Sequence, residues 1–512
     1  MTVLPTGIST ASPLQLAERL RLDLTPRLEP LRQATLGQYL TPAPVAQLMA
    51  AMVELPQADV TILDAGAGAG ALAAALVERL CGRDQPPRSI SVTAYELDTG
   101  LGQALRQTMQ RCAALCAARG VLWECVVREA DFIHEAVAQQ TTPLFEAAPA
   151  VYNCAILNPP YRKINSGSLY RRLLRQVGVE TSNLYAAFVA LAMRLLAPSG
   201  ELVAITPRSF CNGPYFRPFR RDLLAALALR RFHLFETRNT LFRDSQVLQE
   251  NVIFAGQKSA TPPETVTLTT SSGAGAEALT TRMLPFSQVV QPNDPEQFIH
   301  LPAGAAGVPD AGIVACLPAV LAGLGLEVST GRVVDFRALD YLRNEPGADT
   351  APLIYPLHLV GGRVVWPKPG ARKPNALVRA PATRGLFVPN AHYVLVKRLS
   401  SKEERRRVVA TVYDARQIAA EVVGFENHLN YFHAHGQGLD LELARGLAAY
   451  LNSTLVDGYF RQFNGHTQVN ATDLRNLRYP DAAILRAIGQ RIGGEALEQE
   501  ELNRLLAEVL RP

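Results

Sequence analysis

Several features are missing from this 512-residue sequence, and each absence removes a class of protein. It has no run of about 20 apolar residues, the length that a membrane-spanning helix needs. The longest mostly apolar stretch, 312–328, is interrupted by Pro318 and by several glycines. The first 15 residues have neither the basic start nor the apolar centre of a secretory signal. We therefore expect a cytoplasmic protein without a membrane segment.

The seven cysteines include no Cys-x-x-Cys pair and show no zinc-ligand spacing. We interpret them as thiols buried in the core. His433 and His435 form a possible metal pair, but no further ligand cluster stands near them in the sequence. We expect no metal site.

Acidic residues are missing from two basic stretches, although the net charge of the whole chain is only +5. Segment 159–179 holds five basic residues and segment 361–385 holds six. Phosphate contacts by such side chains supply the sequence-independent part of nucleic-acid affinity, and a solvated surface is the alternative. The predicted DNA contacts from these stretches are Arg162, Lys163, Arg171, Arg172, Arg372 and Lys373.

The order of apolar runs predicts an α/β domain at 36–260, where short β-like runs alternate with helical segments. A helical extension (1–35) precedes it. A segment rich in Thr, Ser, Pro and Gly (261–286) predicts a linker, and the remainder (287–512) predicts a mixed α+β domain. The expected strands are 61–63, 91–95, 155–157, 201–205 and 251–254, and the expected helices are 71–80, 101–118, 184–196, 441–451 and 482–510.

A glycine-rich segment follows the first expected strand and opens a helix; it reads Asp64-Ala65-Gly66-Ala67-Gly68-Ala69-Gly70. Such glycines let the backbone approach a ligand at a helix N-terminus, which is typical of nucleotide-type cofactor loops. A packing turn or a dinucleotide loop has the same pattern. Glu96-Leu97 ends the second strand, where a carboxylate can accept hydrogen bonds from ribose hydroxyls. Asp131-Phe132 offers an acceptor for an adenine amine and a ring for its face.

The segment Asn158-Pro159-Pro160-Tyr161 follows the apolar strand at 155–157. Two consecutive prolines keep the backbone extended, so the Asn158 side-chain oxygen and the Pro159 carbonyl can both face one external donor. An amino group with two N–H bonds suits this pair. An accidental Pro-Pro turn is the alternative interpretation.

The chemistry of adenine explains why two acceptors are useful. The lone pair of its N6 nitrogen is delocalised into the ring, and acceptors on both N–H bonds favour the tetrahedral nitrogen of the transition state. A base inside duplex DNA cannot reach such a site, so it must leave the stack and lie between aromatic or apolar walls. Tyr161 is the candidate for one wall.

In the order of these motifs, the chain resembles the γ-class N6-adenine DNA methyltransferases of type II restriction–modification systems, over about 38–258. The resemblance implies a Rossmann-like class I methyltransferase domain with a mostly parallel seven-stranded sheet, S-adenosylmethionine as cofactor, and double-stranded DNA as partner. It assigns cofactor binding to Tyr39, Thr41, Pro42, Asp64, Ala65, Gly66, Gly68, Gly70, Glu96, Leu97, Asp131, Phe132 and Asn158, and catalysis to Asn158, Pro159, Pro160 and Tyr161. It places a second aromatic wall at Phe242, with Phe235 as the alternative.

The resemblance makes 287–512 the target-recognition domain. Asn, Gln and Arg side chains can pair with base edges, and two patches that look like segments of such enzymes are rich in them. The candidate base readers are Asn427, Asn430, Gln468, Asn470 and Arg475, of which Gln468 and Asn470 are the predicted DNA contacts. The alternative is that these side chains hold loops together through backbone hydrogen bonds.

Two other functions share these features. Methyltransferases that modify a protein glutamine amide use the same Asn-Pro-Pro-Tyr motif, because an amide nitrogen poses the same lone-pair problem. A non-catalytic DNA specificity subunit could keep the fold without turnover. Because segment 1–40 leaves no room for a nuclease ahead of the methyltransferase motifs, we expect the restriction endonuclease to be a separate protein. We also expect this chain to act as a monomer.

Overall fold

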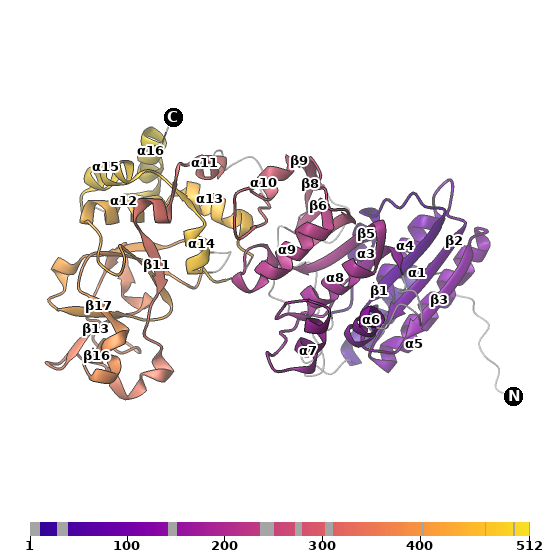
Figure 1. Ribbon diagram of the computed structural model, residues 1–512, viewed down its shortest axis with the longest axis horizontal. Helices are drawn as coiled ribbons and strands as arrows, with labels where there is room; N and C mark the ends of the chain where they lie inside the picture. Colours follow the sequence, from indigo (N-terminus) through magenta and orange to yellow (C-terminus); the bar gives the residue numbers. More distant parts are fainter. Residues whose placement is uncertain are drawn as a thin grey trace. The chain divides into compact units, whose positions relative to one another are not determined.

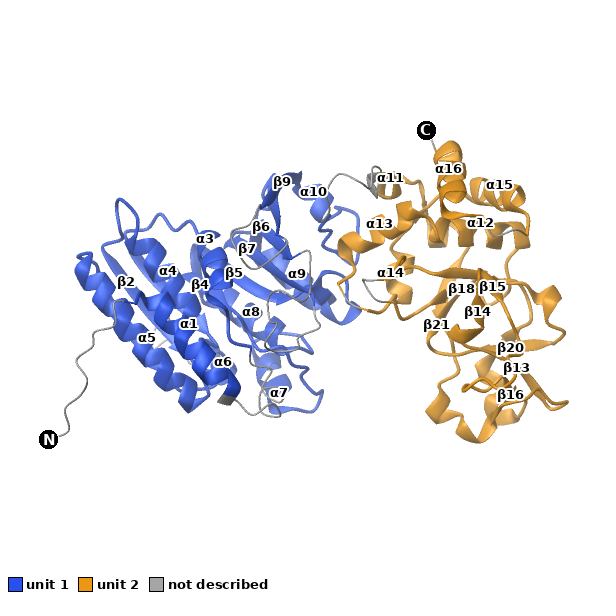
Figure 2. Ribbon diagram, turned by 180° about the vertical axis from the view of Figure 1, so that it is seen from behind, with its two compact units in different colours: residues 1–303 blue, residues 304–512 orange. Residues whose placement is uncertain are grey.

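The computed structural model divides the chain into two compact units, residues 1–303 and 304–512 (Figure 2). The structure describes residues 11–27, 39–141, 151–235, 250–271, 279–302, 311–400, 404–465, 467–494 and 497–510. None of the helices in this described part combines the length and the hydropathy that a membrane span requires.

The first unit is built on a mixed sheet, whose described strands number nine in the order β3-β2-β1-β4-β5-β7-β6-β8-β9 (Figure 1). Strands β1 to β5 are parallel to one another, and β7 is antiparallel to both β5 and β6. The strands are β1 (Asp59–Ala65), β2 (Ser89–Tyr95), β3 (Leu122–Arg128), β4 (Tyr152–Leu157), β5 (Leu196–Pro207), β6 (Leu227–Phe235), β7 (Asn251–Lys258), β8 (Thr265–Ser271) and β9 (Thr280–Pro285).

Helices cover both faces of this sheet, as an α/β fold requires. One core lies under α1 (Pro13–Leu24), α3 (Ala43–Ala51), α4 (Ala71–Cys81) and α5 (Thr99–Ala118). The other lies under α6 (Phe132–Thr141), α8 (Leu184–Leu195) and α9 (Arg217–Ala226), and Leu174 is the buried residue of α7 (Leu169–Gln176) in this core. A short helix, α10 (Phe286–Val289), follows β9. The expected α/β class is confirmed.

Two expectations about this unit are wrong. The sheet has nine described strands rather than seven, because β8 and β9 extend it beyond β6. Segment 261–286 is therefore not a linker, and the two units divide at 303/304. Its Thr-rich run alternates in burial, with Val266 and Leu268 in the core, and this period of two indicates a strand in spite of the surrounding Ser, Pro and Gly.

Parallel order brings the carboxyl ends of β1, β2 and β4 to one edge of the sheet, where α/β proteins bind ligands. The glycine-rich loop follows β1, Glu96 follows β2, and Asn158 follows β4. The topology alone therefore brings these three predicted segments together.

The second unit is mixed α+β, as expected. One sheet has the order β11-β21-β18-β19, with strands Glu327–Thr330, Leu429–His433, Tyr393–Lys397 and Ala410–Tyr413. Another has the order β12-β16-β13-β20-β17, with strands Leu342–Arg343, Ala376–Val378, Thr350–Ile354, Val422–Phe425 and Phe387–Pro389. Two short pairs join β10 (Ala319–Val320) to β22 (Arg478–Tyr479) and β14 (Leu359–Val360) to β15 (Arg363–Val364).

The helices of this unit are α11 (Ala311–Cys316), α12 (Leu441–Leu451), α13 (Thr454–Phe463), α14 (Ala471–Arg475), α15 (Ala482–Ile492) and α16 (Gln499–Val509). The single helix expected at 482–510 is two helices, because Gly493 adopts a φ of +60° after α15. Helices α12 and α15 touch backbone to backbone at Gly446, where a Cβ atom would lie 1.7 Å from the Leu485 carbonyl oxygen.

Candidate active site

A cavity of about 800 Å³, open to solvent, lies at the carboxyl end of the parallel strands. The predicted residues that line it are Tyr39, Gly66, Gly68, Glu96, Leu97, Asp131, Phe132, Asn158, Pro160 and Arg162. The structure thus gathers around one cavity segments that are far apart in the sequence.

The glycine-rich loop forms the floor of this cavity. The backbone N–H groups of Gly66 and Ala67 both donate to the Tyr95 carbonyl at 2.9 Å, which ties the loop to the end of β2. Gly66, Gly68 and Gly70 have φ values of +80°, +57° and +84°, which residues other than glycine rarely adopt. A Cβ atom on Gly68 would lie 2.8 Å from the Leu40 side chain, so the loop and segment 39–42 are in close contact.

Glu96 is a buried carboxylate at the wall of the cavity. Its Oε2 accepts a hydrogen bond from the Gly68 N–H and its Oε1 one from the Asp98 N–H, both at 2.9 Å. Burial raises its pKa, and these two hydrogen bonds oppose the increase. The carboxylate is thereby oriented beside the glycine-rich loop, where the sequence predicts a ribose.

Asp64 lies behind the loop rather than in the cavity. It is fully buried, and its Oδ2 accepts a hydrogen bond from Ala73 N–H in the first turn of α4 at 3.3 Å. No donor among the described residues reaches its Oδ1. Burial raises the pKa of Asp64 to about 7, with a smaller contribution from Glu96. Ala65 and Gly70 are likewise absent from the described lining, so these three predicted cofactor residues support the loop from within.

Asp131 and Phe132 lie at another end of the cavity. Asp131 Oδ1 accepts hydrogen bonds from the Ile133 and His134 N–H groups at 2.9 and 3.2 Å, which cap the start of α6. The Phe132 ring packs against Tyr95 and Phe188, with centroid distances of 5.2 and 5.1 Å. A carboxylate oxygen and an aromatic wall therefore meet here, as the sequence predicts for an adenine ring.

The Asn158 side chain is fixed by segment 39–42, to which the resemblance assigns cofactor binding. Its Nδ2 donates to the Tyr39 carbonyl and to Thr41 Oγ1, both at 2.9 Å. Because a carbonyl oxygen can only accept, the amide nitrogen must face Tyr39 and Oδ1 must face away from it. Thr41 is buried and Pro42 caps α3, so neither belongs to the described lining of the cavity.

Tyr161 lies beside Asn158. Its hydroxyl donates to Asn158 Oδ1 at 3.0 Å and lies 3.3 Å from the Ile205 carbonyl. Its ring contacts Tyr39 and Tyr185 at centroid distances of 5.8 and 6.3 Å. Burial raises its pKa well above the usual range, so the hydroxyl stays protonated at neutral pH. Pro160 lines the cavity, whereas Pro159 is buried.

The two candidates for a second aromatic wall have different outcomes. Phe242 lies outside the described residues. Phe235 ends β6, packs beside His233 and belongs to the core under α3 and α4, and it is not among the described residues of the cavity. The structure therefore places Phe235 in the core.

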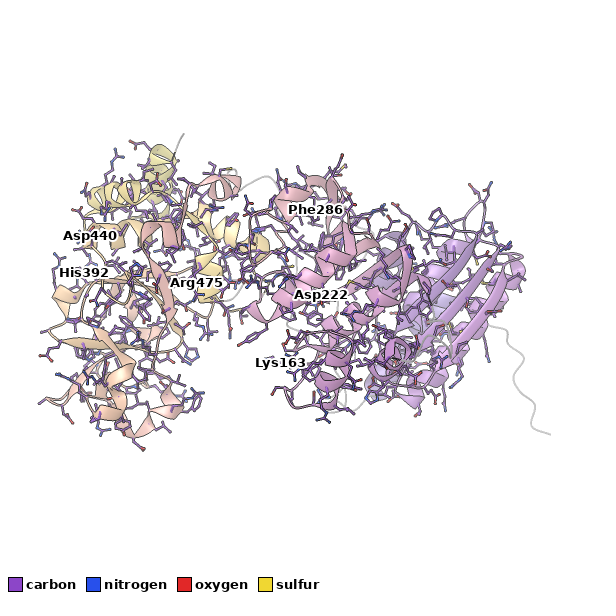
Figure 3. All side chains as sticks on the ribbon, in the orientation of Figure 1. Lys163, Asp222, Phe286, His392, Asp440 and Arg475 are labelled. Carbon is purple, nitrogen blue, oxygen red and sulfur yellow. The ribbon has the colours of Figure 1, made fainter. Side chains whose placement is uncertain are left out.

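The predicted DNA contacts of the first unit surround α7 and the loop before it. Arg162 lines the cavity, and Lys163 is exposed in the same loop (Figure 3). On α7, Arg172 is exposed and Arg171 is half-buried. Of the pair in the second unit, Arg372 is exposed, whereas Lys373 forms an ion pair with Asp335 at 2.6 Å.

The candidate base readers of the second unit divide by burial. Asn430 is fully buried, donates to the Val469 carbonyl at 2.7 Å and accepts from Thr330, so it holds the interior together. The Asn470 side chain contacts Asp473 at the start of α14, and Asn427 is half-buried. Gln468 is exposed, as is Arg475, which also donates to the Val328 carbonyl at 3.3 Å. Asn430 is therefore wrong as a base reader.

The sequence analysis missed several residues of the cavity, namely Tyr95, Leu101, Ala130 and Tyr170, and gave no role to Leu184 and Phe188. Tyr95 and Ala130 directly precede predicted residues, so their position at the strand ends was the available signal. Leu184 and Phe188 lie in the helix expected at 184–196. Tyr170 carried no signal.

The residues around the cavity fit S-adenosylmethionine. Gly66 and Gly68 add no side chain of their own to the cavity, and two carboxylates, Glu96 and Asp131, supply the acceptors for ribose hydroxyls and an adenine amine. Phe132 supplies an apolar wall for the adenine ring.

Comparisons with known proteins agree with this geometry. Residues 124–242 match the family described as Eco57I restriction-modification methylase. The chain is 43% identical to the type II methyltransferase M.PstI of Providencia stuartii over 97% of both chains. It is 42% identical to the type II methyltransferase M.BsuBI of Bacillus subtilis, over 97% of this chain and 98% of that one.

Among solved structures, the type IIL restriction–modification enzyme MmeI in complex with DNA aligns with 98% of this chain and 75% of its own. The TM-score is 0.53 at 12% identity, which supports the fold. The identities to the two curated relatives, over nearly their whole length, establish the family. The chain belongs to the S-adenosylmethionine-dependent methyltransferases of type II restriction–modification systems.

Proposed function

We propose that this protein methylates the N6 amine of an extruded adenine at a specific site in double-stranded DNA. The observation that carries the proposal is the fixed amide of Asn158, whose nitrogen is held by Tyr39 and Thr41 at the wall of the cavity. In this role the protein protects host DNA against a restriction endonuclease that is a separate protein, and it acts as a monomer.

The cofactor, when bound, supplies a methyl group activated by a positively charged sulfur. Glu96, the loop at Gly66–Gly68, Asp131 and Phe132 would hold its nucleoside part. Because Glu96 already accepts hydrogen bonds from Gly68 and Asp98, its carboxylate needs little reordering to receive a ribose hydroxyl. Tyr39 and Leu40 also line this cavity.

Asn158 acts on the target amine through its side-chain oxygen. Tyr161 occupies one lone pair of Oδ1, and the second remains for an N–H of the amine. The Pro159 carbonyl, to which no described residue donates, supplies the second acceptor. Two acceptors on one amine favour its tetrahedral form, so no strong general base is required.

DNA rather than a protein glutamine is favoured by charge. Arg162 lines the cavity and exposed Lys163 follows it, without an acidic residue in segment 159–179. Such a rim suits phosphates. A non-catalytic specificity subunit is disfavoured because the hydrogen bonds that orient the proposed catalytic and cofactor-binding side chains are present. Tyr161 donates to Asn158, and Glu96 accepts from the glycine-rich loop. Residues 304–512 are proposed as the target-recognition domain, with Gln468 and Arg475 as its exposed base-reading candidates.

The test is transfer of labelled methyl from S-adenosylmethionine to duplex DNA, followed by identification of the labelled base. We expect N6-methyladenine. The Asn158→Ala variant is expected to lower the rate about 100- to 1000-fold, the usual cost of removing one preorganised group from a transition state, while cofactor binding persists. Gln110→Ala, which truncates an exposed amide on α5, is the matched control and should keep the wild-type rate. Label on cytosine or on protein contradicts the proposal.

A further inference from the structure

Tyr170 lines the cavity although no motif contains it. It is the second residue of α7, and its hydroxyl donates to Asp131 Oδ2. Its ring packs edge-on against His134, with a centroid distance of 5.8 Å and an interplanar angle of 86°. The contact joins the segment after the catalytic motif to the segment before α6.

The position of Tyr170 is set by the start of its helix. Ser168 caps α7, accepting a hydrogen bond from the Arg171 N–H at 3.4 Å, and Leu174 anchors the helix in the core one turn later. Tyr170 lies between these two fixed points. Its hydroxyl is therefore placed by the fold as well as by its partner.

The hydrogen bonds of Asp131 divide between its two oxygens. Oδ1 accepts from the Ile133 and His134 N–H groups. Oδ2 accepts from the Tyr170 hydroxyl and keeps a lone pair for a further donor. Burial and the neighbouring Asp131 raise the pKa of Tyr170 to about 12, so the hydroxyl remains a donor at neutral pH.

We propose that Tyr170 is a positioning residue that holds Asp131 Oδ2 in place to accept the amine of the cofactor's adenine ring, and that it thereby makes the cavity select adenosyl over inosyl ligands. A carboxylate oxygen fixed in this way attracts an N–H and repels a carbonyl oxygen. The proposal rests on the cofactor-binding role of Asp131 within the proposed function, and it is independent of which DNA base is methylated.

The test compares two probes, S-adenosylhomocysteine and S-inosylhomocysteine, by calorimetric titration of the full chain without DNA. The wild-type protein should bind the adenosyl probe at least about tenfold more tightly, and Tyr170→Phe should weaken that probe about fivefold or more, as the loss of a hydrogen bond to a charged group predicts. The inosyl probe should change by less than about twofold, so the selectivity ratio falls. Tyr215→Phe, which removes the hydroxyl of an exposed tyrosine, is the control and should preserve both affinities.

Two results would overturn the proposal. The first is a wild-type protein that does not discriminate between the probes. The second is a Tyr170→Phe variant whose selectivity ratio equals that of the wild type; if both probes are weakened equally, Tyr170 is a packing wall. Because DNA is absent, a protein that labels cytosine but shows the expected selectivity would refute the proposed function and leave this inference intact.

Discussion

The two units place well-oriented polar side chains in different surroundings. In the first unit, Asn158 and Glu96 are oriented by neighbouring groups but still line an open cavity. In the second unit, Asn430 and Arg407 are oriented just as firmly and are buried in the interior. The difference teaches that residue type and polarity do not by themselves identify a candidate functional side chain; its position at an open cavity does.

The largest expected effect tests this comparison with two arginines, one buried and one exposed. Arg407 donates to Asn464 Oδ1 at 2.8 Å and to Ser400 Oγ at 3.1 Å from a buried position. Arg407→Ala should lower the free energy of unfolding by about 3 kcal/mol, because it leaves buried acceptors unpaired. Arg162→Ala, at an exposed position, should change it by less than about 0.5 kcal/mol and weaken DNA binding instead. Urea unfolding and DNA titration of both variants measure this, and a reversed pattern would refute it.

The next prediction concerns pH and the buried carboxyl of Asp64. Burial raises its pKa to about 7, so the folded state holds the proton more tightly than the unfolded chain, where aspartates titrate near about 3.9. The stabilisation that protonated Asp64 contributes to the folded state is therefore complete below the unfolded pKa of about 3.9. It is lost as pH rises to 7, at up to about 1.4 kcal/mol per pH unit. Asp64→Asn should remove this slope from the unfolding free energy measured at pH 5, 6 and 7. Equal slopes in both proteins would contradict the assignment.

A smaller effect distinguishes two amides of the second unit. Asn430→Ala should destabilise the protein by about 1–2 kcal/mol, because Val469 and Thr330 lose their partner, while the methylated DNA sequence stays the same. Gln468→Ala should leave stability unchanged and relax the choice of sequence, because its side chain is exposed. Sequencing of methylated bases after expression of each variant provides the readout. A change of the methylated DNA sequence in Asn430→Ala but not in Gln468→Ala would contradict this assignment of roles.

The smallest effect sharpens the comparison between two adjacent cations. Arg372→Ala should reduce the slope of log binding constant against log salt by about 0.9, the value for one phosphate contact. Lys373→Ala should reduce it less, because Asp335 already pairs with that ammonium group. Titration of duplex DNA at several salt concentrations measures both slopes. Equal reductions would show that the ion pair opens on binding.

Much of the first unit follows from its sequence, because strand periodicity and parallel order together fix where a strand-end residue lies. The glycine-rich loop, Glu96 and Asn158 each follow an expected strand, and for this reason they line one cavity. Strand β3 was missed because it alternates between exposed and half-exposed residues at the sheet's edge, and β6 was missed because Arg230, Arg231 and His233 interrupt its apolar run.

The parts that escaped prediction depend on contacts distant in sequence. Nothing local shows that Tyr170 reaches Asp131, 39 residues earlier, or that Asp64 turns its carboxylate toward α4 and away from the cavity. Burial of Asn430 likewise depends on Val469, from a different segment. Side-chain direction within a packed unit is decided by such partners and not by the motif itself.

The proline that follows Asn158 also has a consequence for the chemical lifetime of the enzyme. Asparagine ages by deamidation when the backbone nitrogen of the next residue attacks the side-chain amide, and Pro159 has no N–H with which to begin that attack. The product would be especially harmful here, because an aspartate would set a negative oxygen against the Tyr39 carbonyl, which now accepts a hydrogen bond at 2.9 Å. Pro159 therefore protects the Asn158 amide against this route of deamidation.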